Sequence, residues 1–227
     1  MKTLTVFWVI FLFPFAVFAQ SGGNDVLSQL SQAMANQSWD QAIVLFNKVI
    51  NSDVAKAEMY YWTEVDKNSA VCPRMAYALA DYYENARNYD KSYLFYKELT
   101  QMKSDDVNSW VSCANMQVMR GKEKDALTMY LQALKLDPNN LTANIFVGNY
   151  YYFSAEQERQ KIETSYTKLS APTRMQYARY KNSLGEVMSG DYSKAKSYLQ
   201  NVLQHFPSTE AQKTLDKIQL IEKEVNR

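Results

Sequence analysis

Two consecutive windows of this chain, residues 73–106 and 107–140, have the same length of 34 residues and align without a gap. Small and aromatic residues recur at matching offsets, as in the pairs Ala80 and Ala114, and Tyr96 and Tyr130. Self-similarity at a fixed period of this length is the signature of a repeat architecture, in which each unit stacks on its neighbours. We therefore expect an elongated domain of several repeats instead of one layered core.

The repeat resembles a known family at several positions. The tetratricopeptide repeat (TPR) has the pattern W-x2-L-G-x2-Y…A-x3-F…P. The second window carries residues at these offsets: Trp110, Cys113-Ala114, Gln117, Gly121, Ala126, Tyr130, Ala133 and Pro138. The resemblance implies an all-α fold, a right-handed α-solenoid of helical hairpins. It also implies a concave groove, lined by the first helix of each hairpin, that binds other proteins.

The resemblance extends over most of the chain and predicts about five TPR-like hairpins in a domain covering residues 20–227. The expected repeats are 24–53, 73–106, 107–140, 141–172 and 173–207, with an insertion at 54–72 and a capping helix at 208–226. In the fourth repeat we expect a turn followed by a partner helix from about Ala155 to Leu169. In the last repeat, Gly190-Asp191-Tyr192 matches the motif at the turn between its two helices. These two repeats depart most from the motif's spacing.

The insertion has its own aromatic feature. The segment Val54–Val65 predicts a short extra helix that carries Tyr60, Tyr61 and Trp62 in succession. Three adjacent side chains cannot all be buried on one face of a helix. We therefore expect some of these rings to be exposed.

The chain begins with a predicted signal peptide at residues 1–19. Lys2 precedes an apolar segment from Leu4 to Phe18, and Val17-Phe18-Ala19 fits a cleavage site. Cleavage after Ala19 makes Gln20 the mature N-terminus, which predicts secretion or export to the periplasm of a Gram-negative bacterium. An uncleaved membrane anchor is the alternative, although Pro14 interrupts a short apolar run. No later stretch is apolar enough to span a membrane.

Composition points away from nucleic acid. The formal net charge is +1, with 25 basic and 24 acidic residues. Without Lys2 the balance is zero, so we expect no nucleic-acid partner. A protein or a peptide is the expected partner, and the sequence does not indicate an oligomeric state.

Catalytic signals are weak. His205 is the single histidine and lies at the end of a predicted helix, where its ring can contact helix-end carbonyls. No nucleophile motif or glycine-rich phosphate loop accompanies it. Cys72 and Cys113 can either pair or remain thiols, and their different heights in successive repeats favour thiols with Cys113 buried. The sequence therefore predicts no enzyme, no cofactor and no metal site.

The face of each first helix that is offset from its packing stripe is the candidate partner-binding surface. Asn115 and Asn149 lie one period apart on this face, and an amide matches both groups of a peptide bond. The TPR resemblance implies that such asparagines hydrogen-bond an extended peptide. The candidate groove residues are Tyr77, Asp81, Glu84, Asn115, Met119, Asn149, Tyr152 and Phe153.

A plainer interpretation of the same residues exists. The asparagines can be tolerated polar residues, and Met119, Tyr152 and Phe153 can pack against neighbouring helices. Burial of all three would leave no groove surface. The sequence thus predicts an exported interaction scaffold that binds a peptide segment or an envelope protein in its groove. The alternatives are a structural subunit of an envelope or secretion assembly that uses its edges and aromatic insertion, and, least favoured, an enzyme.

Overall fold

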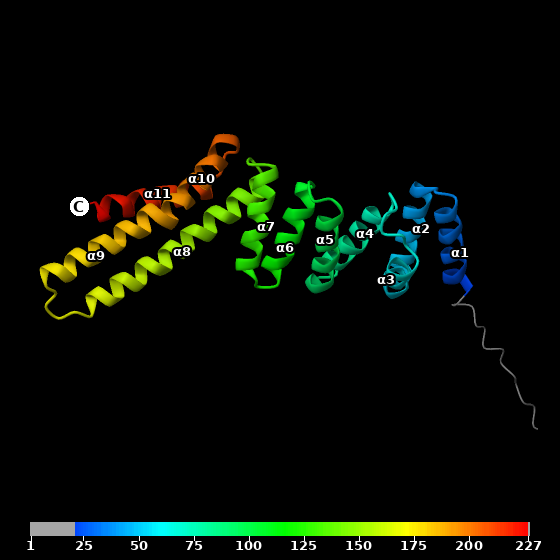
Figure 1. The fold of residues 1–227 in the computed structure, drawn as a ribbon, viewed down its shortest axis with the longest axis horizontal. Coiled ribbons are helices and arrows are strands. Elements are labelled where there is room, and N and C mark those ends of the chain that lie inside the picture. The colour runs from blue at the N-terminus through cyan, green and yellow to red at the C-terminus, as the bar shows by residue number, and fades with distance from the viewer. Residues whose placement is uncertain (1–20, 227) are drawn as a thin grey trace, which may run out of the picture. The chain divides into compact units, whose positions relative to one another are not determined.

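The computed structural model describes residues 21–226, so the predicted signal peptide lies outside the described residues. Every regular element within this range is a helix, which confirms the all-α prediction. The chain divides into two compact units after Met75. Each unit is described on its own, and both are drawn in Figure 1.

Unit 1 begins with a helical hairpin. The unit contains α1 (Ser21–Ala35), α2 (Trp39–Ser52), α3 (Val54–Thr63) and the first residues of α4 (Cys72–Asn85), and its hairpin is formed by α1 and α2. Helices α1 and α2 pack together, and Leu30 from α1 and Ala42 and Phe46 from α2 are fully buried. Apolar residues at helical spacing produce this core, because positions three and four apart lie on one face.

Helix α3 occupies the predicted insertion. The Asp53 side chain caps it by accepting a hydrogen bond from the Lys56 amide at 3.1 Å. Tyr61 is fully buried, whereas the neighbouring Trp62 is exposed. The expectation that the adjacent aromatic rings are divided between core and surface is confirmed.

Unit 2 contains the remainder of the chain. Its elements are the rest of α4, α5 (Tyr89–Met102), α6 (Val107–Met119), α7 (Glu123–Leu136), α8 (Leu141–Thr167), α9 (Arg174–Val187), the π-helical turn η1 (Met188–Tyr192), α10 (Ser193–His205) and α11 (Thr209–Val225).

The two 34-residue windows form the hairpins α4–α5 and α6–α7. The Ser92 hydroxyl of α5 donates to the Ala80 carbonyl of α4 at 2.9 Å. Arg87 and Gly121, one period apart, have φ of 57° and 69° and lie in the turns that follow α4 and α6. A residue with positive φ commonly ends a helix, and glycine adopts it at least cost.

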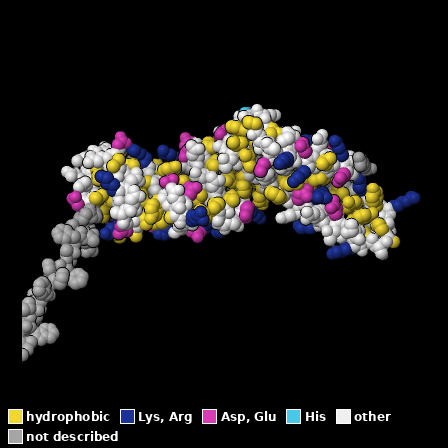
Figure 2. All heavy atoms as spheres, turned by 180° about the vertical axis from the view of Figure 1, so that it is seen from behind, with side chains coloured by type: hydrophobic (Ala, Val, Ile, Leu, Met, Phe, Trp, Pro, Cys, Tyr) yellow, Lys and Arg dark blue, Asp and Glu magenta, His cyan; other side chains and the backbone are white. Residues whose placement is uncertain are grey.

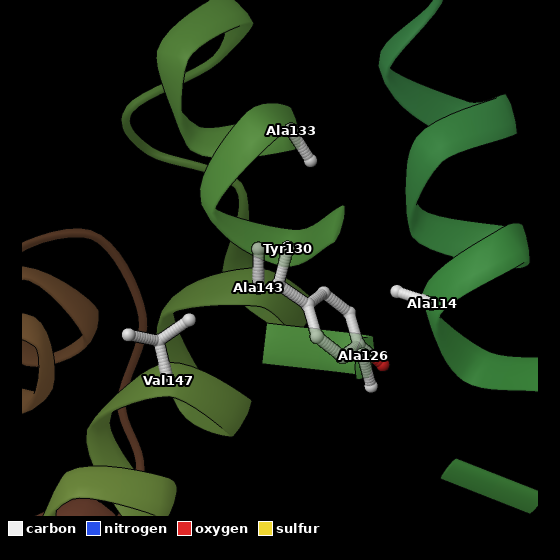
Figure 3. Packing of buried hydrophobic residues seen from close by; sticks show 6 residues of the cluster. All are labelled: Ala114, Ala126, Tyr130, Ala133, Ala143 and Val147. Atoms are coloured by element: carbon white, nitrogen blue, oxygen red, sulfur yellow. The ribbon is translucent and has the colours of Figure 1, made fainter. Parts of the chain in front are cut away.

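A core of small residues joins α6, α7 and α8. Ala114, Ala126, Tyr130, Ala133, Ala143 and Val147 form this buried cluster, which Figure 3 shows. Alanine at facing positions lets helices approach closely, and the Tyr130 ring fills the remaining space.

The expected turn in the fourth repeat is absent. Helix α8 runs without a break for 27 residues, so the predicted partner helix from Ala155 is the second half of α8. The segment SAEQERQK has no glycine or proline, and alanine, glutamate, glutamine and arginine all favour helix. The assignment of residues 141–172 to a hairpin is therefore wrong.

The expected turn at Gly190 is also absent. Gly190 belongs to η1, which joins α9 directly to α10 in one continuous helical run. Positive φ, the conformation for which glycine is needed in a turn, occurs at Gly121 but not at Gly190. Residues 173–207 are therefore not a separate hairpin.

The two corrections together define one long hairpin. Helix α8 packs antiparallel to the run α9–η1–α10 (Figure 1), and α11 packs against α10 where the capping helix was predicted. Gly148 permits the close approach of α8 and α10, because a Cβ atom there would lie 2.8 Å from Leu199 Cγ.

Candidate functional site

A cleft of about 730 Å³ opens between α7 and α8. We call it the α7–α8 cleft. Its lining residues are Glu123, Tyr130, Leu141, Thr142, Ile145, Phe146, Asn149, Tyr150, Phe153, Ser154 and Gln157. Most of its surface is aromatic or aliphatic, with a few amide, hydroxyl and carboxylate groups among them. A concave apolar site with a few polar groups is the usual form of a binding site.

Two of the predicted groove residues lie in this cleft. Asn149 and Phe153 are four residues apart on α8 and therefore share a face with Ile145. Phe153 is 62% exposed, an unusual value for a phenylalanine on a well-formed helix. Its ring is available to a partner.

Asn115 supports the cleft without lining it. The Tyr130 hydroxyl donates a hydrogen bond to Asn115 Oδ1, which fixes the Tyr130 side chain at the cleft wall. Burial raises the pKa of the Tyr130 hydroxyl to about 12, so it remains a donor at neutral pH. One polar atom of Asn115 is thus already used inside the protein.

Tyr152 does not face the cleft. Its ring meets the Tyr192 ring edge-on at 6.2 Å and packs on the cluster of Ala155, Tyr192, Ala195 and Ile218. Successive residues of a helix are about 100° apart around the axis, so Phe153 and Tyr152 point in different directions. Burial raises the pKa of the Tyr152 hydroxyl. The placement of Tyr152 in the groove is therefore corrected.

Met119 lies at another place. It is the last residue of α6, is 53% exposed, and lines a separate depression of about 450 Å³ with turn residues such as Asn88 and Arg120. Arg120 is held there by Asp90 at 2.7 Å. Met119 and Asn149 are therefore in different local sites and do not share one wall.

The predicted groove residues on α4, which are Tyr77, Asp81 and Glu84, form a third patch. The Tyr96 hydroxyl donates to Glu84 Oε2 at 2.8 Å, and Tyr77 meets the Tyr96 ring edge-on at 6.2 Å. Asp81 accepts from Asn85 Nδ2 at 3.2 Å. Burial, followed by the Glu84 hydrogen bond, raises the pKa of Tyr96. The acidic patch exists, but its role in binding stays a prediction.

Sequence reasoning missed much of the cleft wall. Phe146, Tyr150 and Phe153 are spaced by four and three residues, which places their aromatic rings on one side of α8. That spacing was the available signal. The candidate residues were chosen from one offset face of the first helices, so Phe146 and Tyr150 were left out. Glu123 and Tyr130 belong to a second helix, which that choice did not consider.

The cysteines and the histidine, which are the side chains best suited to catalysis, do not line the α7–α8 cleft. Burial raises the pKa of the Cys113 thiol to about 12, which disfavours the reactive thiolate, and Cys72 is also buried. His205 Nδ1 lies 2.9 Å from the Asn201 carbonyl in the last turn of α10, as the sequence predicted. Residues 21–226 contain no cluster of histidine, cysteine and acidic residues arranged to hold a metal ion.

These features define the class of protein. Consecutive hairpins with a 34-residue period, small residues at the helix contacts and a turn glycine constitute a TPR-like fold. In the part of the chain that the structure describes, no helix is long and apolar enough to cross a membrane.

Comparison with solved structures identifies a relative. A protein of Bacteroides ovatus, provisionally described as protein-binding, is 53% identical, with a TM-score of 0.80 over 89% of this chain and 98% of that chain. The chain therefore belongs to the same family as this Bacteroides protein. No protein-family model and no curated protein matches the chain.

Two TPR-type structures show a weaker likeness. MamA is 16% identical, with a TM-score of 0.37 over 80% of this chain and 90% of that chain. A thermophilic TPR protein of Thermus thermophilus is 16% identical, with a TM-score of 0.34 over 87% of this chain and 99% of that chain. At these scores neither protein says anything about a partner.

Proposed function

We propose that this chain is an exported, non-enzymatic interaction protein that binds an extended segment of another protein in the α7–α8 cleft. One observation carries the proposal: the cleft of about 730 Å³ with Phe153 62% exposed at its wall. TPR-like folds commonly mediate protein–protein interaction, and the Bacteroides relative is described in those terms.

The cleft offers both kinds of contact that an extended segment needs. Phe146, Tyr150 and Phe153 provide apolar surface for its side chains. The Asn149 amide can donate to a backbone carbonyl and accept from a backbone amide. Main-chain hydrogen bonds combined with side-chain pockets are a recurring mode of peptide recognition.

The proposed export rests on the sequence of residues 1–19 and determines in which compartment a partner should be sought. Their charged start, apolar segment and Val17-Phe18-Ala19 ending predict cleavage before Gln20. The partner is then a protein of the envelope or of the surrounding medium.

Site-specific photo-crosslinking tests this function. A photoreactive phenylalanine analogue replaces Phe153 in the cleft or, as the matched control, the exposed Leu220 on α11. Illumination of cells followed by purification should give a discrete adduct at position 153 and none at position 220. Equal adducts at both positions, or none at either, would contradict binding in the cleft.

A second candidate function rests on α3. Met59 and Trp62 are both exposed there, at 61% and 48%, beside the buried Tyr61. Large exposed apolar side chains on an insertion favour a structural subunit that docks through this edge. If this edge is the docking site, Trp62→Ala should abolish partner capture and Phe153→Ala should leave it intact. Binding in the α7–α8 cleft predicts the reverse result for the two variants.

A further inference from the structure

The far end of the long hairpin has no core. None of residues 156–183, all of which the structure describes, is buried, although Ala155 and Leu184 on either side are. Between α8 and α9 a shallow depression of about 320 Å³ remains open near this end. Most helices in proteins are stabilised by packing of a buried apolar face. A hairpin that extends beyond its buried core is therefore suited to contact another molecule.

The apex of this hairpin is apolar and aromatic. Tyr166 and Tyr180 stack with ring centroids 4.2 Å apart. Met175 is 66% exposed, Tyr177 is 50% exposed, and Leu169 is exposed in the connecting loop. Figure 2 shows hydrophobic and basic side chains together at this end of the molecule. Residues 161–181 are called the hairpin tip below.

The hairpin tip is strongly basic. It contains Lys161, Lys168, Arg174, Arg179 and Lys181 against a single acid, Glu163. Arg159 already binds Glu163 at 2.6 Å. The whole chain has a formal net charge of only +1, so positive charge is concentrated here.

Three of these cations lack an anionic partner among the residues that the structure describes. In the described range 21–226, no carboxylate forms an ion pair with Lys168, Arg174 or Arg179. Lys161 pairs with Glu158 at 3.2 Å, and Lys181 donates to the Val225 carbonyl. These three cations lie near the exposed Leu169, Met175 and Tyr177 in the sequence. Lys168 and Arg174 flank the loop, and Arg179 Nη2 donates to Met175 Sδ at 3.7 Å.

We propose that the hairpin tip docks on the surface of an anionic lipid membrane. Basic side chains are attracted to anionic headgroups, and tyrosine rings occupy the interface because one end is apolar and the other polar. Leu169 and Met175 can enter the boundary between headgroups and acyl chains, as the apolar face of an interfacial helix does. This role is independent of the α7–α8 cleft.

Charge and chemistry favour a membrane over a second copy of the chain as the binding partner of the hairpin tip. Two hairpin tips placed against each other would oppose basic residues with basic residues, which is unfavourable. A membrane supplies both negative charge and an apolar layer over a broad surface, and both are matched by a projecting apex. An acidic protein matches the charge, but soluble proteins rarely expose an apolar area of comparable extent.

Vesicle binding tests the proposal. The chain from Gln20 onward is used, because the apolar segment at residues 4–18 would itself bind lipid. It should sediment with vesicles of equimolar phosphatidylglycerol and phosphatidylcholine and remain in solution with pure phosphatidylcholine. High salt should release it, because screening weakens surface electrostatics.

A matched pair of variants assigns the binding to the tip. Lys168→Gln with Arg174→Gln removes two positive charges, and the partition coefficient should fall on the order of 30-fold, at about one kcal/mol per basic residue. Lys124→Gln with Lys213→Gln makes the same charge change at exposed positions elsewhere. This control should bind as the parent does.

Two outcomes overturn the proposal. One is no binding to the anionic vesicles at low salt. The other is an equal loss in both variants, which would show attraction by total charge alone. Binding to poly-glutamate at low salt, with none to vesicles, would assign the hairpin tip to an acidic protein and also overturn membrane docking.

Fluorescence tests insertion directly. Met175→Trp places a reporter at the apex, and its emission should shift to shorter wavelength with anionic vesicles and be quenched by brominated lipids. Leu220→Trp, on the exposed face of α11, should show neither effect. Vesicle-bound Met175→Trp protein with unshifted emission from the new indole would contradict entry of the apex into the interface.

Discussion

The Tyr192 hydroxyl donates a hydrogen bond to the carboxylate of Glu156, which lies 36 residues earlier in the chain. Arg159 joins both groups, with Nη2 at 2.9 Å from Glu156 Oε2 and Nε at 3.1 Å from the Tyr192 oxygen. Tyr192 is the last residue of η1, and its ring is buried against α8. This network ties α8 to the returning run next to Ala155, the last buried residue of α8.

The first prediction concerns pH and Glu156. Burial alone would raise the pKa of this carboxyl, but hydrogen bonds from Arg159 and Tyr192 outweigh it and lower the pKa. A lowered folded pKa contributes stability above the unfolded value of about 4.3, and the contribution is lost as pH falls through the folded value. Glu156→Gln should lower the free energy of unfolding at pH 7 by about 1.5–3 kcal/mol.

Denaturant melts at several pH values measure this effect. The difference between the parent and Glu156→Gln should shrink as pH falls below about 4. Glu158→Gln is the control, because Glu158 forms only an exposed pair with Lys161 at 3.2 Å. It should change stability by about 0.5 kcal/mol or less. A pH-independent difference for Glu156→Gln would contradict the assignment.

The second prediction concerns the contact of α6, α7 and α8. Ala126 is fully buried beside Tyr130 (Figure 3), so a larger side chain there must displace its neighbours. Ala126→Leu should destabilise the protein by about 1–3 kcal/mol through overpacking. Thr128→Leu, at an exposed position of the same helix, controls for the change in side chain. An unchanged unfolding midpoint for Ala126→Leu would mean that this contact is misplaced.

The third prediction uses two glycines with opposite expected signs. Gly121 has φ of 69° and nothing within 4 Å of an added Cβ, so Gly121→Ala should cost about 1 kcal/mol in backbone strain alone. Gly185 lies within α9, also in open space, and Gly185→Ala should stabilise by about 0.5–1 kcal/mol. Calorimetric melts should therefore shift in opposite directions, and two shifts of the same sign would refute the conformational argument.

The fourth prediction concerns partner affinity. Asn149→Ala with Phe153→Ala removes an amide and an exposed ring from the α7–α8 cleft. Capture of the crosslinked partner should drop at least about tenfold, while the unfolding midpoint stays close to that of the parent, because neither side chain is buried. Asn115→Ala is a less clean test, because it removes the acceptor of the Tyr130 hydroxyl. Undiminished capture by the double variant would place the partner elsewhere.

The fifth prediction concerns maturation. Because the apolar segment ends at Val17-Phe18-Ala19, the exported protein should begin at Gln20. Intact mass and N-terminal sequencing of the envelope fraction measure this directly. A chain that keeps Met1 and stays in the membrane pellet would favour the uncleaved anchor.

The hairpins at residues 73–140 were predictable because several small contact residues recur at the 34-residue period, as in the pairs Ala80 and Ala114, and Ser92 and Ala126. The continuity of α8 was less accessible. There, local helix propensity in SAEQERQK prevails over a repeat register that predicts a turn, and one sequence gives no measure of their relative strength. Gly190 misled in the same way, since glycine fits a turn with positive φ, as at Gly121, and also a helix, as at Gly190.

The candidate site was predicted only in part. Asn149 and Phe153 follow from helical spacing, which fixes a face to within one residue. Tyr152 lies on the border of that face, and the packing of Tyr192 from η1 decides its direction. Contacts between elements that are distant in sequence, such as Tyr192 with Glu156, leave no periodic signal.

The uninterrupted course of α8 has a geometric consequence. Phe153 at the α7–α8 cleft and Tyr166 at the hairpin tip lie on the same helix, 13 residues apart. At 1.5 Å per residue, they are separated along the axis by about 20 Å. The continuous helix therefore fixes the distance along its axis between a molecule bound in the α7–α8 cleft and a surface contacted by the hairpin tip.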